Sequence, residues 1–498
     1  MSPFSYVDVF RLAVPESVLV IGALFVLFLD LVQLREHSAD FRSAFLAGTT
    51  AVFCTVGIAW LQVIPQTGSL PDGMLVMNPT TTLVKQCLLG LTALTALISW
   101  RTPFTRHIGE YFALLLLATV GMLFLASAQH LLMIFVALEL FSLSLYVLVA
   151  FNKESRHSAE AALKYFLFGG MAAAFTLFGL SLVYGLTGQL SLAGIAKAMA
   201  DRPPELLLHV ALVMTLVGFG YKIAVAPFHL WAPDAYQGAP TPAAAFIASG
   251  SKVASFYVLA NVLMLGFGAQ AGDAGWGHFQ SGWQPVIAIF ATMSMVIGNL
   301  VALNQTSVKR LLAYSAIAHA GYALVGVLAN SPEGLSSVVF YSVTYALATL
   351  GAFAVVYVVE QNSGTDDLDA FLGLKQHSPA LAVSLMIFLL SSAGIPPLAG
   401  FFGKFYVFVA GVKSGSADLG LVWLVALALV MSAVSLYYYL QVLKRALVKE
   451  AASSATKFTV SPTVVVVIAL MAAAVVALGC LPTLLIPAVA SSAAVVPH

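Results

Sequence analysis

Charged residues are scarce in this chain of 498 residues, since Asp, Glu, Lys and Arg together make up only 9% of it. Hydrophobic residues make up 60%, and the mean hydropathy is +0.96, far outside the range of a soluble domain. This composition excludes a soluble enzyme. The formal net charge of +1 supplies neither a basic field for nucleic acid nor an acidic tail. We therefore expect no nucleic-acid partner, and expect the chain to meet its partners within the lipid bilayer.

Cysteine and cofactor motifs are also lacking. The three cysteines, Cys54, Cys87 and Cys480, lie far apart in apolar runs and form neither a CxxC pair nor a disulfide framework. The sequence contains no GxxxxGK[ST] loop, no G-x-G-x-x-G after a strand, and no His or Cys spacing suited to zinc, haem or an iron–sulfur cluster. We therefore expect no cofactor and no metal on this chain.

Long apolar runs are what the sequence has in abundance. About fourteen runs are near the 20-residue length that crosses a hydrocarbon core as a helix. The predicted fold is an all-α polytopic membrane protein. The expected spans are 15–34, 43–63, 79–99, 110–127, 130–151, 161–186, 206–232, 241–266, 284–303, 308–329, 335–359, 379–412, 419–443 and 461–488.

Basic residues outside the spans are distributed unevenly, which predicts the orientation because short loops rich in Lys and Arg stay in the cytoplasm. One set of alternate loops and helix ends carries most of them: Arg35, Arg42, Arg101, Arg106, Lys153, Arg156, Lys164, Lys309, Arg310, Lys375, Lys444, Arg445, Lys449 and Lys457. The other side carries only Arg11, Lys197, Arg202 and Lys413. An even number of spans then places both termini on the outer face, which is periplasmic in a bacterium.

Four lysines fall inside the expected spans: Lys85, Lys222, Lys252 and Lys404. A charge at the centre of a membrane helix costs roughly 2.5 to 3.5 kcal/mol on insertion scales, so such residues are rare without a task. Lys85 lies near a helix end, where we expect its side chain to snorkel to the interface. Among the acids, Glu139 alone is expected deep within a span.

Two spans contain helix breakers. Pro227 interrupts the seventh span, and Pro396, Pro397, Gly400 and Gly403 interrupt the twelfth. Broken helices in lipid are tolerated where they line a cavity or pack inside protein, and a pair of them is typical of a transport site.

Because the two breaks are five spans apart, spans four to eight and nine to thirteen are predicted to be two five-helix repeats of opposite topology. The predicted division is an N-terminal three-helix segment (1–109), a first repeat (110–267), a second repeat (282–448) and a C-terminal transmembrane helix (460–498).

The deep charges suggest proton chemistry. Burial disfavours a charged lysine and a nearby carboxylate restores it, so a Glu139–Lys222 pair would control proton release from Lys222. Lys252 would be the next proton carrier and Lys404 would end the line. A structural alternative stays open, because a single intramembrane Glu–Lys pair can simply join two helices.

Two histidines are candidate relay residues. His229 would share a face with Lys222 if the helix were regular, and His319 lies in the middle of the tenth span. For His229 the alternative is a hydrogen bond to carbonyls freed by Pro227. For His319 it is an ordinary core histidine with its hydrogen bonds satisfied.

Five motifs carry a resemblance to a known family: VALELFSLSLYVL, EAALKYFLFG, GYKIAVAPFHLWAPDAYQGAPTP, SVKRLLAYSAIAHAGY and GIPPLAGFFGKFYVF. In this order they resemble the antiporter-like membrane subunits of respiratory complex I, the NADH-quinone oxidoreductase. The resemblance implies fourteen helices with two inverted five-helix repeats and broken helices seven and twelve. It also implies proton translocation through a central axis, with NADH oxidation, quinone reduction, FMN and iron–sulfur clusters in other subunits.

Carried over residue by residue, Glu139 matches the family's helix-five glutamate, and Lys222, Lys252 and Lys404 match its lysines on helices seven, eight and twelve. His229 and His319 match possible relay positions. The implied partners are the other membrane-arm subunits, including neighbouring antiporter-like subunits, and the implied location is a bacterial inner membrane.

Two features favour one type of subunit within this family. The chain ends soon after the fourteenth span without a long lateral helix, and the charge on helix twelve is a lysine, Lys404, where another type has glutamate. An Mrp-type sodium–proton antiporter subunit is the alternative, because such subunits can carry the same four charges. A scaffold subunit that moves no proton is a third possibility.

Overall fold

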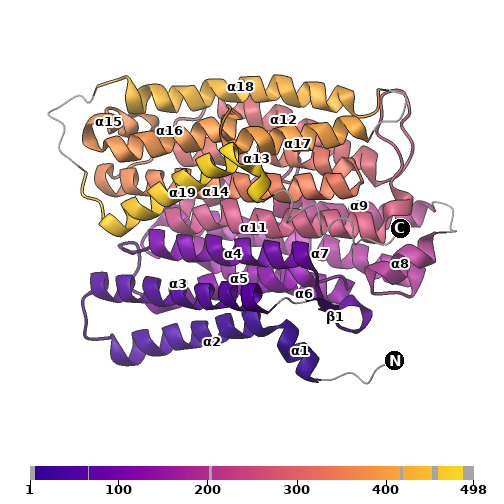
Figure 1. Cartoon of the computed structure of the whole chain (residues 1–498), viewed down its shortest axis with the longest axis horizontal. Coiled ribbons are helices and arrows are strands. Elements are labelled where there is room, and N and C mark those ends of the chain that lie inside the picture. The colour runs from indigo at the N-terminus through magenta and orange to yellow at the C-terminus, as the bar shows by residue number, and fades with distance from the viewer. Residues whose placement is uncertain (1–5, 65–66, 201–204, 415–418, 451–457, 486–498) are drawn as a thin grey trace.

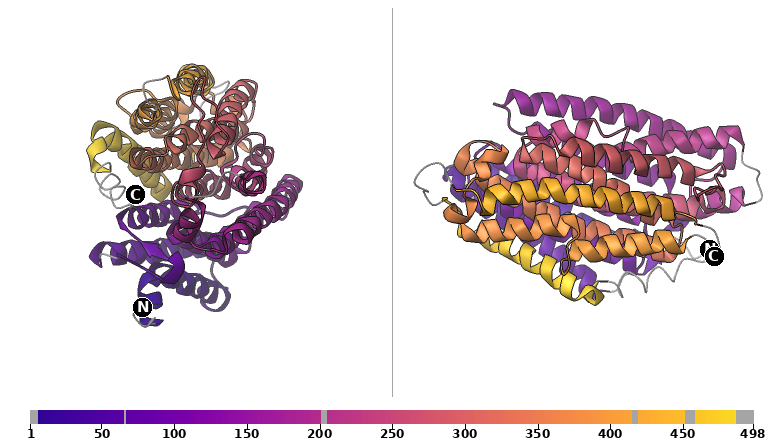
Figure 2. Two further views of the ribbon diagram at one scale, coloured as in Figure 1. Left: turned by 90° about the vertical axis from the view of Figure 1, so that its right-hand side faces the viewer. Right: turned by 90° about the horizontal axis from the view of Figure 1, so that it is seen from above.

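The computed structural model describes residues 6–64, 67–200, 205–414, 419–450 and 458–485. These residues form a bundle of helices that run along the longest axis of the molecule (Figure 1) and are seen nearly end-on when it is turned (Figure 2). Among the described residues, thirteen helices are long and apolar enough to cross a membrane. The shorter apolar helix Pro379–Ala393 and its successor form a further, broken crossing. The prediction of an all-α polytopic membrane protein is confirmed.

The N-terminal part contains three spans and a small hairpin at one end of the bundle (Figure 1). Its elements are α1 Tyr6–Leu12, α2 Val14–Phe28 with its π-helical extension η1 Leu29–Gln33, α3 Ala39–Val63, β1 Gly68–Ser69, η2 Pro71–Gly73, β2 Val76–Met77 and α4 Pro79–Ile98. The middle of the chain follows with α5 Ile108–Ser127, α6 Leu131–Val149, α7 Arg156–Thr187, α8 Leu192–Met199, α9 Leu206–Ile223, α10 Trp231–Gly238, α11 Thr241–Asn261, η3 Val262–Gly266 and η4 Gly268–Gln270.

The remaining helices pack against this first group. They are α12 Trp283–Ala302, α13 Val308–Leu328, α14 Pro332–Ser363, η5 Leu368–Phe371, α15 Leu374–His377, α16 Pro379–Ala393, α17 Ala399–Lys413, α18 Val422–Leu447, α19 Pro462–Cys480 and η6 Pro482–Leu484. The expected spans correspond to these helices, although α7 and α14 extend several residues beyond their predicted ends. The last span was predicted as 461–488, but α19 ends at Cys480, and residues 486–488 lie outside the described residues. The division into two repeats and two terminal segments stays a prediction.

Polar caps explain where several spans begin. The side chain of Asn78 accepts a hydrogen bond from Thr81 N at the start of α4, and those of Ser155, Ser307 and Ser331 do the same for α7, α13 and α14. A side-chain oxygen at this position satisfies one of the free N–H groups of the first turn. These caps therefore indicate where the helices begin. Hydrophobic periodicity does not indicate it, because these spans are apolar on every face.

The basic loops gather at one end of the bundle, which we call the basic end. It lies at the left of Figure 1, where α2 turns into α3 and where α15 lies. The predicted loop residues that are described lie at helix ends or connections there, whereas Lys197 of α8 lies at the opposite end. Arg202 and Lys457 lie outside the described residues.

The two helix breaks have the same backbone conformation. Ala224 follows α9 and Gly394 follows α16, and both adopt left-handed conformations, with φ/ψ of 56°/44° and 88°/37°. In each case the next N–H reaches back five residues, from Val225 N to Gly220 O and from Ile395 N to Leu390 O, both at 3.0 Å. This closure is typical of a Schellman helix end. The predicted interruptions of helices seven and twelve are confirmed, since α9 ends four residues before Pro227 and α16 ends four residues before Pro397.

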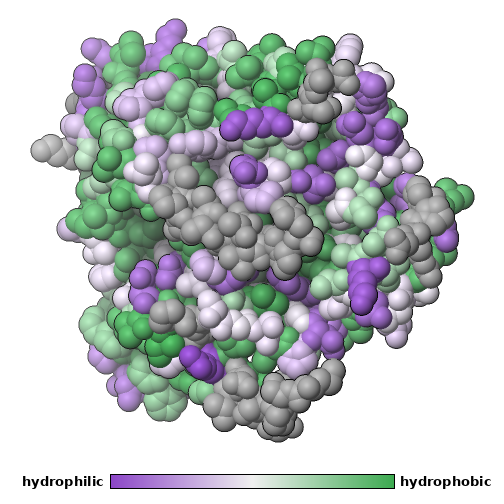
Figure 3. All heavy atoms as spheres, turned by 45° about the vertical axis from the view of Figure 1, so that its right-hand side comes forward, coloured by the Kyte–Doolittle hydropathy of each residue, from purple (hydrophilic) through white to green (hydrophobic). Residues whose placement is uncertain are grey.

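The helix α11 forms the centre of the bundle, since all of its residues from Thr241 to Asn261 are buried. It packs against α14, α4, α5 and α9. The outer helices instead expose large apolar side chains, such as Leu24 on α2, Phe166 on α7 and Leu429 on α18. Hydrophobic side chains cover much of the flank in Figure 3, as a lipid-facing surface requires.

Candidate functional site

Lys222 lies near the end of α9 and points at α6. Its side chain is 8% exposed, and Nζ donates a hydrogen bond to Ser142 Oγ. Nζ also lies 5.1 Å from the ring centroid of Phe141, 5.6 Å from that of Tyr146 and 5.5 Å from that of Tyr221. Aromatic faces attract cations at such distances, so the site can hold a positive charge without a direct carboxylate partner.

Glu139 lies on the same helix as Ser142, three residues earlier. Side chains at this spacing are neighbours on a helix surface, about 5–6 Å apart at Cβ. Lys222 therefore contacts the part of α6 that carries Glu139, whereas a direct Glu139–Lys222 pair stays a prediction. Glu139 is half-buried, and none of the ion pairs among the described residues involves it. The carboxylate of Glu139 therefore lies near the site of Lys222 but forms no ion pair with it.

Lys252 reaches the first helix break from α11. Its Nζ donates to Ile223 O at 2.6 Å and lies 5.8 Å from the ring centroid of Trp231. Ile223 is the last residue of α9, so its carbonyl belongs to the group that a helix end leaves unsatisfied. Ile223 directly follows Lys222 in the chain. Lys252 therefore contacts the residue next to Lys222.

Lys404 occupies the matching place at the second break. Its Nζ donates to Ala393 O at 3.0 Å and to Ser432 Oγ at 2.7 Å, and lies 5.0 Å from the ring centroid of Tyr322. Ala393 ends α16 as Ile223 ends α9. The sequence shows more deep lysines than deep carboxylates, and the structure explains how Lys252 and Lys404 are accommodated: main-chain oxygens at the breaks act as their acceptors.

His319 of α13 is surrounded by tyrosines from α14 and α18, which we call the tyrosine cage. Its Nδ1 lies 2.7 Å from Tyr341 Oη, its Nε2 lies 3.1 Å from Tyr439 Oη, and its ring stacks on Tyr345 with centroids 4.4 Å apart. A cavity of about 10 Å³ beside it reaches Ser392, next to the second break. That volume is close to the minimum that holds one water molecule.

His229 lies in the first helix break, between the end of α9 and the start of α10. The helix is therefore not regular here, and the condition under which His229 would share a face with Lys222 is not met. The helix ends at Ile223, and periodicity cannot be carried across the break. Its side chain is 8% exposed, and Nδ1 is buried without a hydrogen-bond partner. The main chain of Pro227 lies within hydrogen-bonding reach of the ring, so the alternative of a hydrogen bond to a carbonyl freed at the break stays open.

Lys85 was expected to snorkel, and this expectation is wrong. The side chain is 0% exposed and forms an ion pair with Glu16 of α2, with 2.6 Å between Nζ and Oε1. A lysine can snorkel only along a surface that faces lipid, whereas this face of α4 is covered by protein. Because the partners are far apart in the chain, no local motif could have indicated the pair.

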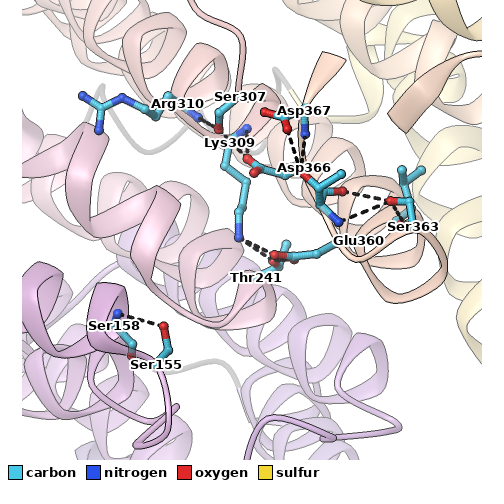
Figure 4. Close-up of polar contacts among 12 residues, drawn as sticks. Ser155, Ser158, Thr241, Ser307, Lys309, Arg310, Glu360, Ser363, Asp366 and Asp367 are labelled. Atoms are coloured by element: carbon cyan, nitrogen blue, oxygen red, sulfur yellow. Dashed lines mark hydrogen bonds and ion pairs between the residues drawn. The ribbon is translucent and has the colours of Figure 1, made fainter. Parts of the chain in front are cut away.

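The basic end contains two linked ion networks that the sequence reading missed. Lys309 Nζ lies 2.7 Å from Glu360 Oε1 and 3.3 Å from Thr241 Oγ1 at the start of α11 (Figure 4). The next residue, Arg310, pairs with Asp234 of α10 at 2.6 Å. Consecutive basic residues of α13 therefore fix both the start of α11 and the outer part of the broken helix.

Asp234 joins a third helix through Lys164 of α7, at 2.9 Å. Partial burial raises the pKa of Asp234, but hydrogen bonds and positive charge from Lys164 and Arg310 outweigh this effect. The pKa of Asp234 therefore lies below its ordinary value, and the carboxylate stays charged at neutral pH.

Comparison with known proteins agrees with the resemblance carried by the motifs. Residues 128–435 match the family described as NADH:quinone oxidoreductase/Mrp antiporter, TM. NADH-quinone oxidoreductase subunit N 2 of Acidobacterium capsulatum is 50% identical over 495 residues, which cover 97% of this chain and 99% of that protein. This chain belongs to the NADH-quinone oxidoreductase subunit N family.

Solved structures agree with this membership. A chain of respiratory complex I from Thermus thermophilus with bound aureothin is 33% identical, with a TM-score of 0.78 over 96% of this chain and all of that one. A chain of the Mrp complex from Dietzia sp. is 20% identical, with a TM-score of 0.77 over 96% of this chain and 97% of that one. The second likeness shows the fold alone, so subunit N is favoured over the Mrp alternative.

Proposed function

We propose that this chain translocates protons as a membrane-arm subunit of a bacterial NADH-quinone oxidoreductase, respiratory complex I. Its partners are the other membrane-arm subunits, including neighbouring antiporter-like subunits. NADH oxidation and quinone reduction, with FMN and the iron–sulfur clusters, take place in other subunits, and this chain carries no cofactor. The identity to subunit N over nearly the whole chain supports this proposal.

The observation that carries the proposal is the hydrogen bond from Lys252 to Ile223 O, one residue after Lys222. Lys222 is the proton donor and Lys252 the next carrier, joined by the broken backbone between them. Glu139 modulates Lys222: when its carboxylate is charged and near, the ammonium form of Lys222 is favoured, and when its influence is removed the proton is released.

Lys404 is the last carrier on this axis, at the second break. His319 passes the proton toward the second break, and a cavity beside its ring supports this role, because the cavity reaches Ser392, which precedes the residue whose carbonyl accepts from Lys404. His229 lies within the first break and serves there as a further relay. Water in these narrow spaces would complete the path, since hydroxyl and imidazole groups alone leave gaps along it.

The test is NADH-driven proton pumping by membranes whose complex carries Lys222→Ala. NADH oxidation and assembly are measured in the same membranes, and Lys375→Ala, which removes an exposed lysine of α15, is the matched control. The proposal expects an assembled complex with lost pumping or stalled turnover, beside a normal control. Normal turnover with normal pumping would leave this chain as a scaffold.

We further propose that the basic end faces the cytoplasm and that both termini lie on the periplasmic side of the bacterial inner membrane. The gathering of basic loops at one end supports this orientation. The opposite end, with α8 and the β1–β2 hairpin, would then receive the translocated protons.

A further inference from the structure

The ion pair of Glu16 and Lys85 lies outside the proton axis and outside the residues matched by the family model. Both side chains are fully buried, at 1% and 0% exposed. Glu16 Oε1 accepts from Lys85, whereas Glu16 Oε2 is buried and has no hydrogen-bond partner. An unpartnered carboxylate oxygen in a buried site is a place where a proton or a water molecule can bind.

Stability alone does not account for this pair. Taking two charges out of water costs several kcal/mol per ion, and replacing a buried ion pair by apolar residues of similar size is often neutral or stabilising. Glu16 is the third residue of α2, where the positive end of the helix dipole favours the carboxylate. The site is therefore arranged to hold a negative charge next to a positive one.

Polar groups connect this pair with the helix that carries Lys252. Thr81 lies one turn before Lys85 on α4, and its Oγ1 lies 3.1 Å from Tyr257 Oη on α11. Tyr257 is five residues beyond Lys252, toward the end opposite the basic end. Between them on α11, Ser255 Oγ is buried and has no hydrogen-bond partner. Hydroxyl groups thus extend from Lys252 toward the pair.

The positions of Lys252 and Lys85 along their helices agree with a proton path from the centre of the bundle to the outer face. Lys252 lies about 16 Å along α11 from Thr241 at the basic end, at 1.5 Å per residue. Lys85 lies only about 9 Å from the start of α4, which begins at the hairpin of the opposite end. The pair is therefore between the central lysine and the outer surface.

We propose that Glu16 and Lys85 form a second proton-binding site, in which the carboxylate of Glu16 accepts the proton that leaves Lys252 on its way to the outer face. This inference rests on the proposed function. The proton moves from the ammonium group of Lys252 through the hydroxyl groups of Ser255, Tyr257 and Thr81, with water between them, to Glu16 Oε2. Lys252 becomes neutral and Glu16 becomes a carboxylic acid. When the proton is released outward, Glu16 returns to a carboxylate, and Lys85 keeps its charge throughout.

The test uses the whole complex in membranes and measures protons moved per NADH oxidised. The double variant Glu16→Gln/Lys85→Met removes both charges and leaves no unpaired one. Its matched control is Asp30→Asn/Arg42→Gln, which removes the ion pair of 2.8 Å between η1, the extension of α2, and α3 at the basic end. If Glu16 accepts the proton, the first double variant lowers the ratio to that of Lys222→Ala, and the control keeps the full ratio.

Two further variants keep the proposal falsifiable. Tyr257→Phe removes one hydroxyl with little change in packing, and it decides the question if the double variant fails to assemble: a lowered ratio supports the path and a full ratio overturns it. Combining Glu16→Gln/Lys85→Met with Lys222→Ala should cause no further loss, because groups on one path are not additive. A full ratio in an assembled double variant overturns the second site, whereas a full ratio in Lys222→Ala overturns the proposed function itself.

Discussion

Lys252 donates a hydrogen bond from its Nζ to the main-chain oxygen of Ile223, 2.6 Å away. Lys404 makes the same contact with Ala393 at 3.0 Å. In both cases the acceptor is the last residue of a helix that ends in a left-handed residue inside the membrane. Each lysine thus satisfies a carbonyl exposed by a helix break, and each break gives its lysine an acceptor in a medium that offers few others.

Lys252→Met is expected to damage both stability and pumping. The substitution leaves the oxygen of Ile223 without its donor, and an unsatisfied buried polar group costs about 1–3 kcal/mol. It also removes the proposed proton carrier. The complex should lose activity at a lower temperature than the wild type and move fewer protons per NADH, as measured by thermal inactivation and by a pH-sensitive dye in sealed vesicles.

Lys252→Arg is the control for this experiment. Arginine keeps a donor near Ile223 but does not release its proton at physiological pH. It should recover much of the thermal stability while pumping stays low. Recovery of pumping by arginine would contradict a relay role and favour a structural one.

Gly394→Ala is expected to disturb Lys404 through the backbone. Gly394 adopts φ of 88°, and an added Cβ would lie 3.1 Å from Cδ of Lys404. Left-handed backbone costs a non-glycine residue roughly 1–2 kcal/mol, and the lysine stem must also move. Pumping should fall although the lysine itself is unchanged. Gly90→Ala, where an added Cβ meets nothing within 4 Å, should leave the proton ratio unchanged, and equal effects at both glycines would contradict a specific role for Gly394.

The sequence predicts the spans, the two breaks and the three central lysines, because each is a local pattern: an apolar run, a helix breaker, or a charge where charges are costly. It does not predict Ser142 and Ser432 as lysine partners. A serine in a membrane helix usually bonds back to its own helix, and nothing local distinguishes the serines that also meet a lysine. The partner of Lys85 was missed for a related reason, since a contact between α2 and α4 depends on packing that no local pattern records.

The cage around His319 predicts that its tyrosine hydroxyl groups matter more than the rings. Tyr341→Phe removes the group 2.7 Å from Nδ1 and leaves the stacking on Tyr345 in place. We expect slower pumping with normal assembly, measured as protons moved per NADH in vesicles. Tyr314→Phe, on the same helix and only partly buried, is the matched control. If His319 is an ordinary core histidine, both variants will pump normally.

The network around Asp234 predicts a simple dependence on pH. Because the pKa of Asp234 lies below its ordinary value of 3.8, the stabilisation that it provides is fully present above that value and is lost only as pH falls through the lowered pKa. Asp234→Asn should therefore lower the thermal-inactivation temperature of the complex by a similar amount at every pH between about 5 and 8. A difference that disappears within this range would show that another group controls the network.

The proposed orientation predicts which side of the membrane each end of the bundle faces. Lys375 and Lys197 are exposed residues at the basic end and at the opposite end, respectively. In a chain whose exposed Cys480 is replaced by serine, Lys197→Cys should react with a membrane-impermeant maleimide added to intact spheroplasts. Lys375→Cys should react only after the membrane is opened, because the proposed orientation places the basic end in the cytoplasm. The reverse labelling pattern would show that the chain has the opposite orientation in the membrane. The path from Lys252 toward Glu16 would then lead protons toward the cytoplasm.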